Sequence, residues 1–533
     1  MKILSIIFVL LFIQQSYSQN FPKSFEIGNS IQNIDASENP VSNSISDMVM
    51  IGDTIYLATS RGLSKSIDRG NSWINFYGTD AFGTESISSI GYYNGIIWTA
   101  TAHSLKKDNQ FLPVGSGIRF STDGGGSWKV VPQPLDKDND TIVVYGINQL
   151  RALPVTVAVQ NIIYDMSFTP NYIWISTFAG GLRKSRIDSL IINPNAKWER
   201  VVLPPDNLNS IKPTDTLRFA LQPVGGRFGN ESHLNHRVFS VLASNDSTLW
   251  VGTANGINRS TDGGVSWRKL NYQNQDQSIS GNFVVALDYN SFNNTIWAAT
   301  WKAEDQNEFT GVSYSDNNGE TWKRALAGER THNFGIFKNF VIACTDNGPF
   351  LSSGFGNQWI LPATIIDSRT KLRLRTTTFY AAGVLPSNEQ IFLGTNDGLV
   401  ENKFIGSNWS DNWKISFASQ PVQQQSETYA FPNPFSPRQE EIKIFYSTGG
   451  NERNVTIRIF DFGMNLVRTV VQNVKRGNFT HQVTSAVNSG QNGVIDFWDG
   501  KDDVGIYVPN GVYFYRVEFD NDESIFGKIM VLQ

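Results

Sequence analysis

The turn at residues 260–267, Ser-Thr-Asp-Gly-Gly-Val-Ser-Trp, constrains the fold most, because close copies of it return at intervals suited to one small antiparallel sheet. It follows predicted strands at 248–252 and 256–260, and a third strand starts at Trp267. Asp262 can accept hydrogen bonds from the turn's own backbone N–H groups, Gly264 tolerates positive φ, and Trp267 can fold its ring under the hairpin. The repeat therefore predicts a fold built from successive small sheets.

The pattern is S-x-D-x-G-x-[ST]-W, and three further copies follow it, the last with Asn in place of Asp. The residues at the two side-chain positions are Asp68 and Trp73, Asp123 and Trp128, Asp262 and Trp267, and Asn317 and Trp322. This pattern resembles the Asp-box, or BNR, repeat of sialidase-type and related β-propellers. In that family the box is a structural turn at the outer edge of a blade, remote from any active site. The resemblance implies a folding role for these eight residues.

The second strand of each unit carries a bulky apolar residue followed within a few places by a small residue and Thr. Seven such strands end at Thr59, Thr101, Thr177, Thr253, Thr300, Thr345 and Thr395. Four of the gaps between them are 42–50 residues, as four-strand blades require, and two are 76 residues and need insertions. We therefore predict an all-β chain with a seven-bladed β-propeller at 46–418.

The N-terminus has the pattern of a secretory signal peptide at residues 1–18. Lys2 precedes an apolar run at 3–13, which is too short for a stable membrane span, and small residues stand before Gln19. We expect a secreted protein with no membrane span. Residues 19–45 form a polar lead-in that either precedes the ring or lends it a closing strand.

Composition excludes some partners. The net charge is −4 and only 17% of residues are charged, so nothing favours nucleic acid or an anionic membrane. The one cysteine, Cys344, makes no internal disulfide, so packing and ring closure must supply stability.

One side of the ring collects the long connections. In a four-strand blade, the loop between the second and third strands and the connection to the next blade emerge on the same face, which we call the loop face. The long segments 103–115, 301–309, 132–161 and 199–237 all belong to these two classes. Folds of this kind usually form their binding sites from long loops that a rigid ring holds in place. The candidate binding residues there are Arg61, His103, Phe178, Arg227, His233, His236, Arg237, Trp301, Arg330, His332, Asp346 and Asp397.

Two groups of residues suggest metal sites, and both also have simpler interpretations. His233 and His236 could bind a metal, but a lone H-x-x-H lacks a third ligand, and structural or solvated histidine is the simpler interpretation. Asp136, Asp138 and Asp140 look like the start of a calcium loop, yet the glycine and the bidentate glutamate of such a loop are missing. We expect no cofactor, with calcium as the one open alternative.

The C-terminal segment has a different composition. A polar linker at 419–428 precedes an all-β domain at 429–533, with strands predicted at 442–446, 455–460, 466–471, 478–483 and 512–519. Its YAFPNPFSP start, its FWDGKDDVGIYVPNGVYFY segment and its GKIMVLQ end resemble the Ig-like domain of flagellar hook-capping proteins and, more closely, the C-terminal sorting domains of type IX secretion cargo in Bacteroidetes-like bacteria. The resemblance implies an Ig-like β-sandwich read by the type IX machinery and delivery to the cell surface. A plain β-sandwich spacer is the alternative.

Two functional classes remain open from the sequence. The first is a non-catalytic propeller that binds a glycan or protein, or serves as a surface structural component. The second is a glycoside hydrolase of the sialidase or a related type. A sialidase needs an arginine cluster for the sugar carboxylate and a Tyr–Glu nucleophile pair. The family's Arg-Ile-Pro signature is missing near the first blade, so the binding class is favoured.

Overall fold

A computed structural model describes residue 37 and residues 39–533, apart from 109, 369–372, 375, 419–427, 449–451, 477–492 and 521–523. The predicted signal peptide at 1–18, most of the lead-in, nearly all of the linker and the predicted strand at 478–483 lie outside these residues. The described chain forms two compact units, one reaching to Ala418 and the other starting at Thr428. Each unit is described by itself.

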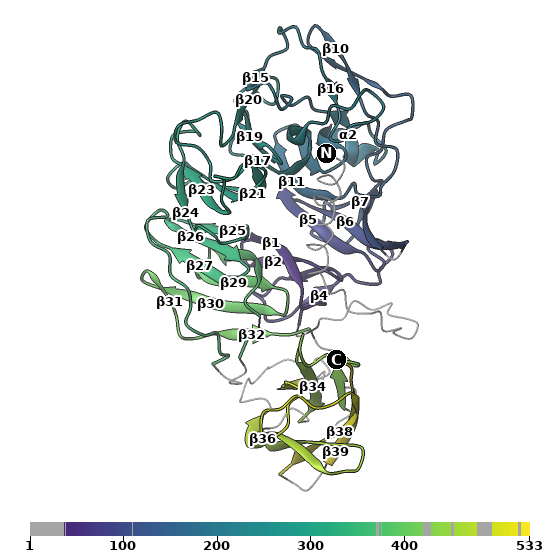
Figure 1. Cartoon of the computed structure of the whole chain (residues 1–533), viewed down its shortest axis with the longest axis vertical. Helices are drawn as coiled ribbons and strands as arrows, with labels where there is room; N and C mark the ends of the chain where they lie inside the picture. Colours follow the sequence, from purple (N-terminus) through teal and green to yellow (C-terminus); the bar gives the residue numbers. More distant parts are fainter. Residues whose placement is uncertain are drawn as a thin grey trace. The chain divides into compact units, whose positions relative to one another are not determined.

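The first unit consists of small antiparallel sheets that follow one another in chain order (Figure 1). Apart from a small sheet formed by the long insertions, its described strands form seven such sheets. The first three are β1 (Ile45–Ile51), β2 (Thr54–Thr59), β3 (Gly62–Ser66) and β4 (Ile74–Asn75); β5 (Ser86–Tyr93), β6 (Ile96–Lys107), β7 (Gln110–Ser121) and β8 (Lys129–Val131); and β11 (Ile163–Thr169), β12 (Tyr172–Thr177), β13 (Gly181–Arg186) and β14 (Glu199–Arg200). The next two are β17 (Val238–Ala243), β18 (Leu249–Thr253), β19 (Gly256–Ser260) and β20 (Trp267–Leu270); and β21 (Phe283–Asn290), β22 (Thr295–Trp301), β23 (Gly311–Ser315) and β24 (Lys323–Ala325). The last two are β25 (Thr331–Phe337), β26 (Phe340–Thr345) and β27 (Gly348–Ser352); and β28 (Phe379–Leu385), β29 (Gln390–Thr395), β30 (Leu399–Ile405), β31 (Asn408–Trp409) and β32 (Lys414–Ser416).

The first strands of these sheets close a ring. They contact one another in the order β1, β5, β11, β17, β21, β25 and β28, and β28 contacts β1. The end of the lead-in joins this closure, because the backbone oxygen of Asn43 accepts a bond from Gly398 N at 2.8 Å and its side-chain oxygen accepts one from Ala418 N at 2.6 Å. The fold is therefore a β-propeller.

Every first strand contains one bulge near its start. The pairing with the second strand skips one residue in each sheet, and these residues are Ser46, Ser88, Tyr164, Phe239, Val285, His332 and Tyr380. A bulge re-aims the side chain that it leaves unpaired. The repeat thus sets one unpaired side chain per sheet at the same place around the ring.

The repeated turn is held by its own acidic side chain. Asp262 Oδ1 accepts the backbone N–H groups of Val265 and Ser266 at 3.1 and 2.9 Å and the Ser260 hydroxyl at 2.8 Å, while the Ser266 hydroxyl donates to Oδ2. The turns at Asp68, Asp123 and Asn317 have corresponding bonds. Trp267 is 2% exposed, so its ring is buried beneath the hairpin.

The turn glycine also touches the neighbouring sheet. Gly264 has φ +82°, and a Cβ there would lie 2.5 Å from Cη2 of Trp174, on the second strand of the preceding sheet. The same relation pairs Gly70 with Phe392, Gly319 with Trp250, and Gly356 with Trp297. Since Phe392 belongs to the last sheet and Gly70 to the first, this contact also spans the ring closure.

Several connections differ from simple loops. Residues 103–115, predicted as a loop, extend the β6–β7 hairpin. A short helix, α2 (Ile187–Ile192), stands where no helix was predicted, and Leu190 is buried in the apolar cluster that includes Trp98. The two long insertions pair with each other through β9 (Ile142–Tyr145), β10 (Asn148–Ala152) and β16 (Ala220–Leu221), and β15 (Ser210–Ile211) adds to β20. A 3₁₀ turn, η1 (Leu234–His236), leads into β17.

The C-terminal unit is a β-sandwich of two sheets. One contains β33 (Thr428–Phe431), β34 (Ile442–Ser447) and β37 (Gly493–Trp498); the other contains β36 (Leu466–Arg476), β35 (Arg453–Phe460), β38 (Gly511–Phe519) and β39 (Ser524–Val531). One core unites both sheets and includes Ile444, Ile457, Trp498, Tyr515 and Ile529. Strand β37 was not predicted, although its apolar run follows the turn dipeptides Ser489-Gly490 and Asn492-Gly493.

Candidate functional site

A polar groove of about 440 Å³ opens on the loop face, between the sheet that begins with β17 and the sheet that begins with β21. It is built from four separate connections. Its lining residues are Asp206, Asn209, Leu234, Ala254, Asn255, Asn271, Gln273, Asn274, Asn282, Ala303, Glu304 and Glu308. Amides and carboxylates thus make up most of the wall, and no Lys or Arg is among them.

The amide side chains of the groove hold one another in place. Asn271 Nδ2 donates to Asn255 Oδ1 at 3.2 Å, and Asn274 Nδ2 donates to Asn209 Oδ1 at 3.1 Å. Asn282 Nδ2 donates to Gln273 Oε1 at 2.8 Å. Four of these amides, those of Asn271, Gln273, Asn274 and Asn282, use both their oxygen and their nitrogen in bonds within the protein, so the wall is preorganised.

Two of the three carboxylates in the groove serve the structure. Glu308 is 3% exposed and accepts the backbone N–H groups of Asn282 and Ala303 at 3.0 and 2.7 Å and the Asn282 amide at 2.9 Å. Asp206 accepts the N–H groups of Leu234 and Asn235, each at 2.8 Å, and so caps η1. Glu304 is exposed, which leaves it the carboxylate best placed to meet a ligand.

Sequence reasoning missed every residue of this groove. A signal was present in residues 271–282, NYQNQDQSISGN, whose density of Asn and Gln is unusual beside the rest of the chain.

Four of the predicted residues come together in the sheets that begin with β21 and β25. They are Trp301, Arg330, His332 and Asp346. His332 Nε2 lies 2.7 Å from Asp346 Oδ1, Arg330 lies 4.0 Å from Asp346, and the Arg330 guanidinium stands 4.6 Å from the centre of the Trp301 ring. Burial alone would raise the pKa of Asp346, but the bond from His332 and the charges of His332 and Arg330 lower it below its usual value. Trp301 donates its indole N–H to Thr331 O at 2.8 Å. The cluster is held together by these internal contacts.

A chain of ring contacts runs from this cluster along the first strands. The pairs, with centroid distances, are His332–Tyr380 at 5.1 Å, Trp301–His332 at 5.8 Å, Phe283–Trp301 at 5.9 Å, Phe239–Phe283 at 4.5 Å, Phe178–Phe239 at 6.2 Å and Tyr164–Phe239 at 5.6 Å. Four of these rings occupy bulge positions, which explains why residues far apart in sequence meet.

The other predicted residues stand in separate places. Arg61 packs over Tyr77, His103 Nδ1 contacts Glu85 at 3.2 Å and Ser116 at 2.9 Å, and Arg227 donates to Asp138 O at 3.0 Å. Arg237 donates to Pro223 O and packs over Phe178, and Asp397 accepts a bond from Asn43 at 3.3 Å. The twelve candidates therefore do not form one site.

The histidine pair is buried rather than open. The rings of His233 and His236 lie 5.0 Å apart, and His236 Nε2 contacts Leu203 O at 3.1 Å. Burial lowers the pKa of both, that of His236 to about 4, so both are neutral at pH 7. Within the part of the chain that the structure describes, no group of three or more His, Cys, Asp or Glu is placed to hold a metal ion.

The aspartates considered for calcium face arginines instead. Asp136 makes two bonds to the Arg183 guanidinium, at 2.8 and 2.7 Å, and Asp140 accepts one from Arg200 at 2.7 Å. Two of the three carboxylates are thus neutralised by the protein, and this arrangement does not fit a calcium ion.

Three further carboxylates lie on first strands of the ring and repel one another. Asp47, Asp165 and Asp288 lie on β1, β11 and β21, and each retains some accessible surface although protein surrounds it. Burial raises the pKa of Asp47 to about 7, of Asp165 to about 8 and of Asp288 to about 7. In each case a hydrogen bond from the backbone N–H of the next residue lowers the pKa, but by less than burial raises it. The repulsion among them adds to the rise for Asp165 and Asp288.

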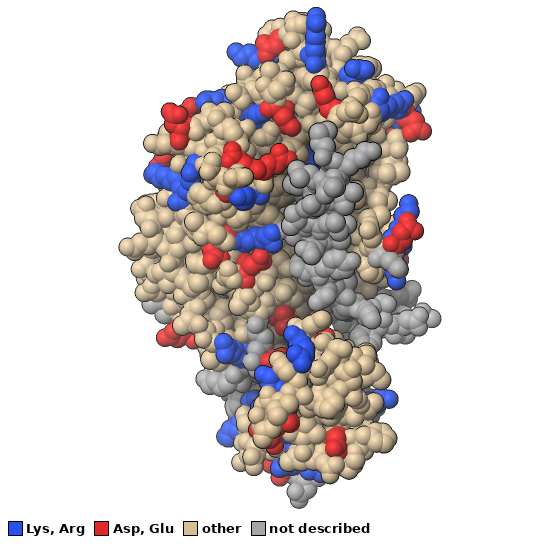
Figure 2. All heavy atoms as spheres, in the orientation of Figure 1, with Lys and Arg blue, Asp and Glu red and all other residues tan. Residues whose placement is uncertain are grey.

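The face shown in Figure 2 carries acidic and basic side chains interspersed among neutral ones. In the described residues no helix is long and apolar enough to cross a membrane.

No protein-family model and no curated protein sequence matches the chain. Solved structures with a similar fold include PorZ, an essential bacterial surface component of the type-IX secretion system of Porphyromonas gingivalis, at 15% identity and a TM-score of 0.40. They also include an ancestral GH74 enzyme, at 13% identity and 0.45, and YCF48 bound to D1 peptide, at 13% and 0.41. These matches cover 90%, 94% and 72% of this chain, and 64%, 64% and 99% of the other chain. The chain thus spans less than two thirds of PorZ and of the GH74 enzyme, and the likeness concerns the fold alone.

Proposed function

We propose that this protein is a surface-delivered, non-catalytic binding propeller whose loop-face groove takes an uncharged glycan. The observation that carries the proposal is the groove itself. It encloses about 440 Å³, and its wall includes six Asn or Gln side chains and three carboxylates. Its volume lies in the range of about 300–1,000 Å³ typical of small-ligand sites.

The chemistry of the wall favours a ligand rich in hydroxyl groups. Asn and Gln offer both donors and acceptors, and a sugar hydroxyl can serve as either. Protein partners are usually anchored by aromatic or aliphatic side chains in apolar pockets, whereas only Leu234, Ala254 and Ala303 supply apolar wall here. The groove therefore suits an oligosaccharide better than a peptide.

The charge of the wall favours an uncharged sugar. Asp206, Glu304 and Glu308 stand in the groove without a lining cation, so a sialic acid or uronic acid carboxylate would meet like charge. A sialidase requires the opposite, a cationic grip on the sugar carboxylate.

Hydrolysis is the less favoured function. Glycosidases need a pair of carboxyl groups, one free to donate a proton and one to act as base or nucleophile. Glu308 is committed to backbone and amide donors and Asp206 caps η1, which leaves Glu304 alone. Turnover of any glycan by the purified protein would replace binding with catalysis as the function.

The binding test uses the mature protein on a panel of neutral and acidic oligosaccharides, followed by calorimetry on any hit. Asn255→Ala removes one amide from the wall, and we expect affinity for a neutral glycan to fall about 2- to 10-fold, the effect of one hydrogen bond. Asn347→Ala is the matched control. Asn347 occupies the same turn position in another sheet, with its N–H on Thr345 Oγ1 at 3.0 Å as Asn255 N–H is on Thr253 Oγ1, but it does not line the groove.

The charge can be tested separately. Glu304→Gln keeps the size of an exposed side chain and removes its charge. We expect acidic oligosaccharides to gain affinity relative to neutral ones in this variant. Tighter binding of acidic than of neutral glycans by the unaltered protein would contradict the proposal.

Delivery to the surface is proposed to depend on the C-terminal domain. A signal peptide, a polar linker and a terminal β-sandwich with sorting-domain motifs support this. We expect a chain lacking residues 419–533 to stay in the periplasm with a folded propeller, because the propeller has its own core. Cell fractionation of that strain, with surface protease digestion as a second readout, checks the expectation; unimpaired surface delivery would show that the domain is only a spacer.

A further inference from the structure

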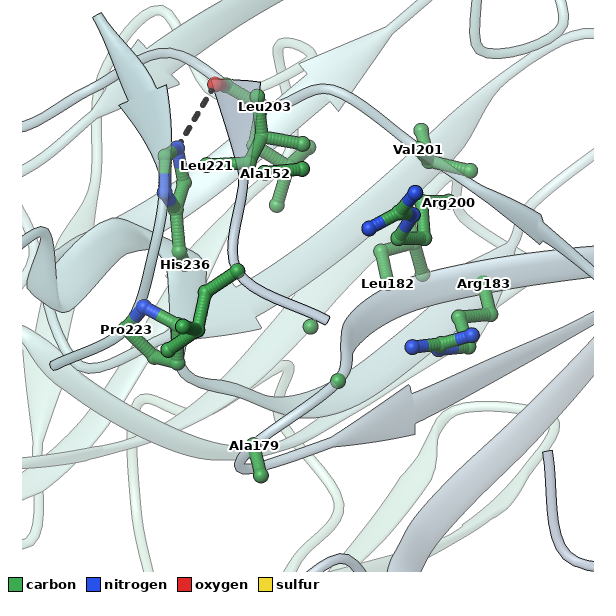
Figure 3. A pocket seen from close by; sticks show the side chains of 13 residues that line it. Ala152, Ala179, Leu182, Arg183, Arg200, Val201, Leu203, Leu221, Pro223 and His236 are labelled. Carbon is green, nitrogen blue, oxygen red and sulfur yellow. Dashed lines mark hydrogen bonds between the residues drawn. The ribbon is translucent and has the colours of Figure 1, made fainter. Parts of the chain in front are cut away.

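A second, much smaller cavity of about 30 Å³ lies where the two long insertions meet the sheet of β11–β14 (Figure 3). Arg183 and Arg200 stand on one side of it, and His236 and Pro223 stand on the other. The remaining wall is largely apolar, with Leu182, Val201, Leu203 and Leu221. The cavity is separate from the groove of the proposed function.

Arg183 is a buried cation with one nitrogen that lacks a partner. Its side chain is 1% exposed and its two terminal nitrogens bind Asp136, itself 5% exposed. Its third nitrogen, Nε, has no hydrogen-bond partner among the described residues. A Cβ at Gly180 would lie 2.8 Å from this Nε, so the glycine keeps the approach to the donor open.

Arg200 supplies a second unpartnered donor. Its side chain is 9% exposed, and Nη2 binds Asp140 at 2.7 Å. Its Nη1 lies 3.8 Å from Asp136 and makes no hydrogen bond within the described chain. Asp140, whose side chain is 45% exposed, pairs with Arg200, and the buried Asp136 pairs with Arg183. What has no partner is one buried N–H donor on each cation, and a buried donor of a charged group favours an anionic acceptor.

We propose that the cavity is a binding site for a chloride-sized monovalent anion, held by Arg183 Nε–H and Arg200 Nη1–H. A water molecule needs about 10–15 Å³ of such space, so 30 Å³ accommodates one halide ion or two waters and is too small for sulfate or a sugar. Apolar walls suit a weakly hydrated halide. The bound anion accepts hydrogen bonds from both N–H donors and fastens residues 132–161 and 199–237 to the ring.

The first test is thermal unfolding of the mature protein in sodium chloride, bromide and gluconate at one ionic strength. A ligand that binds only the folded state at twenty times its dissociation constant shifts the unfolding equilibrium about 20-fold. For a protein of this size we expect Tm to be about 2 °C higher in either halide than in gluconate. Equal Tm values in the three salts would overturn the proposal and assign the cavity to water.

The second test locates the ion. Arg200→Gln should abolish the difference between halide and gluconate, whereas Arg268→Gln should retain it, because Arg268 pairs with Glu320 at the exposed surface. If Arg200→Gln does not fold, crystals of the unaltered protein in bromide decide the matter. An anomalous peak is expected between Arg183 Nε and Arg200 Nη1, and its absence at 0.2 M bromide (roughly twenty times a dissociation constant of about 10 mM) would refute the site.

Discussion

Replacing Gly264 by alanine tests how the repeated turn joins one sheet to the next. The substitution has two costs. Alanine at φ +82° enters a left-handed conformation that costs about 1–2 kcal/mol, and its Cβ would lie 2.5 Å from the Trp174 ring. Trp174 is 1% exposed and cannot move aside freely, so overpacking adds about 1–3 kcal/mol. We expect a total loss of about 2–5 kcal/mol in the free energy of unfolding.

The adjacent glycine provides the control. Gly263 has φ +72° and open space around its Cβ position, so Gly263→Ala carries the backbone cost without the clash. Denaturant unfolding of both variants under the same conditions isolates the contact with Trp174. Equal losses of stability would mean that the glycine serves only the turn, and that the contact between sheets contributes nothing measurable.

Three further predictions concern the turn at Asp262, the carboxyl of Asp47 and the last strand of the C-terminal unit. Asp262→Ala should lower the free energy of unfolding by about 1–2 kcal/mol, because the turn loses its acceptor, and should leave glycan binding unchanged; calorimetric binding and denaturant unfolding of the variant check both. The pKa of Asp47 is raised from 3.8 to about 7 in the folded protein, so the folded state holds a proton that the unfolded state has lost, and stability falls by about 1.4 kcal/mol per pH unit between roughly pH 4 and pH 7. Asp47→Asn should flatten this fall, matching the unaltered protein at pH 4 and exceeding it in Tm at pH 8; a parallel pH profile would contradict the assignment. Deleting residues 527–533 removes Ile529 and Val531, both 0% exposed, so limited proteolysis should degrade the C-terminal unit while the propeller resists.

The all-β fold and the propeller architecture could be predicted because the interactions behind them are local in sequence. Asp262 accepts bonds from donors three and four residues ahead and from a hydroxyl two residues behind. All of these bonds lie within residues 260–266, so the sequence pattern of that segment is enough to predict the turn. The helix α2 was missed for the opposite reason. At six residues it is too short to show a helical period, and it is stabilised by burial of Leu190 in a cluster that draws residues such as Trp98 from another sheet.

The sites could not be found in this way, because distant segments assemble them. The polar groove takes Asp206 from one connection, Asn255 from a hairpin turn, Asn282 from the next connection and Glu304 from a further loop. These residues form a recognisable site only after the ring has brought the four segments together. Short spacing alone suggested metal binding at His233 and His236 and calcium at Asp136, and the sequence already favoured structural or solvated histidine for the first pair.

The bulges show how a regular repeat can still build an irregular site. Each first strand bulges at the same place, so the backbone sets one unpaired side chain per sheet around the ring regardless of sequence. What stands there differs, from serine in the first two sheets to Tyr164, Phe239, His332 and Tyr380 in others. The turns on the outer edge have nearly invariant chemistry because each must make the same bonds and the same contact with its neighbour. The bulge positions bear no such requirement, because the skipped residue has no pairing partner on the second strand. The loop-face end of the ring can therefore change its ligand chemistry without disturbing the contacts that close it.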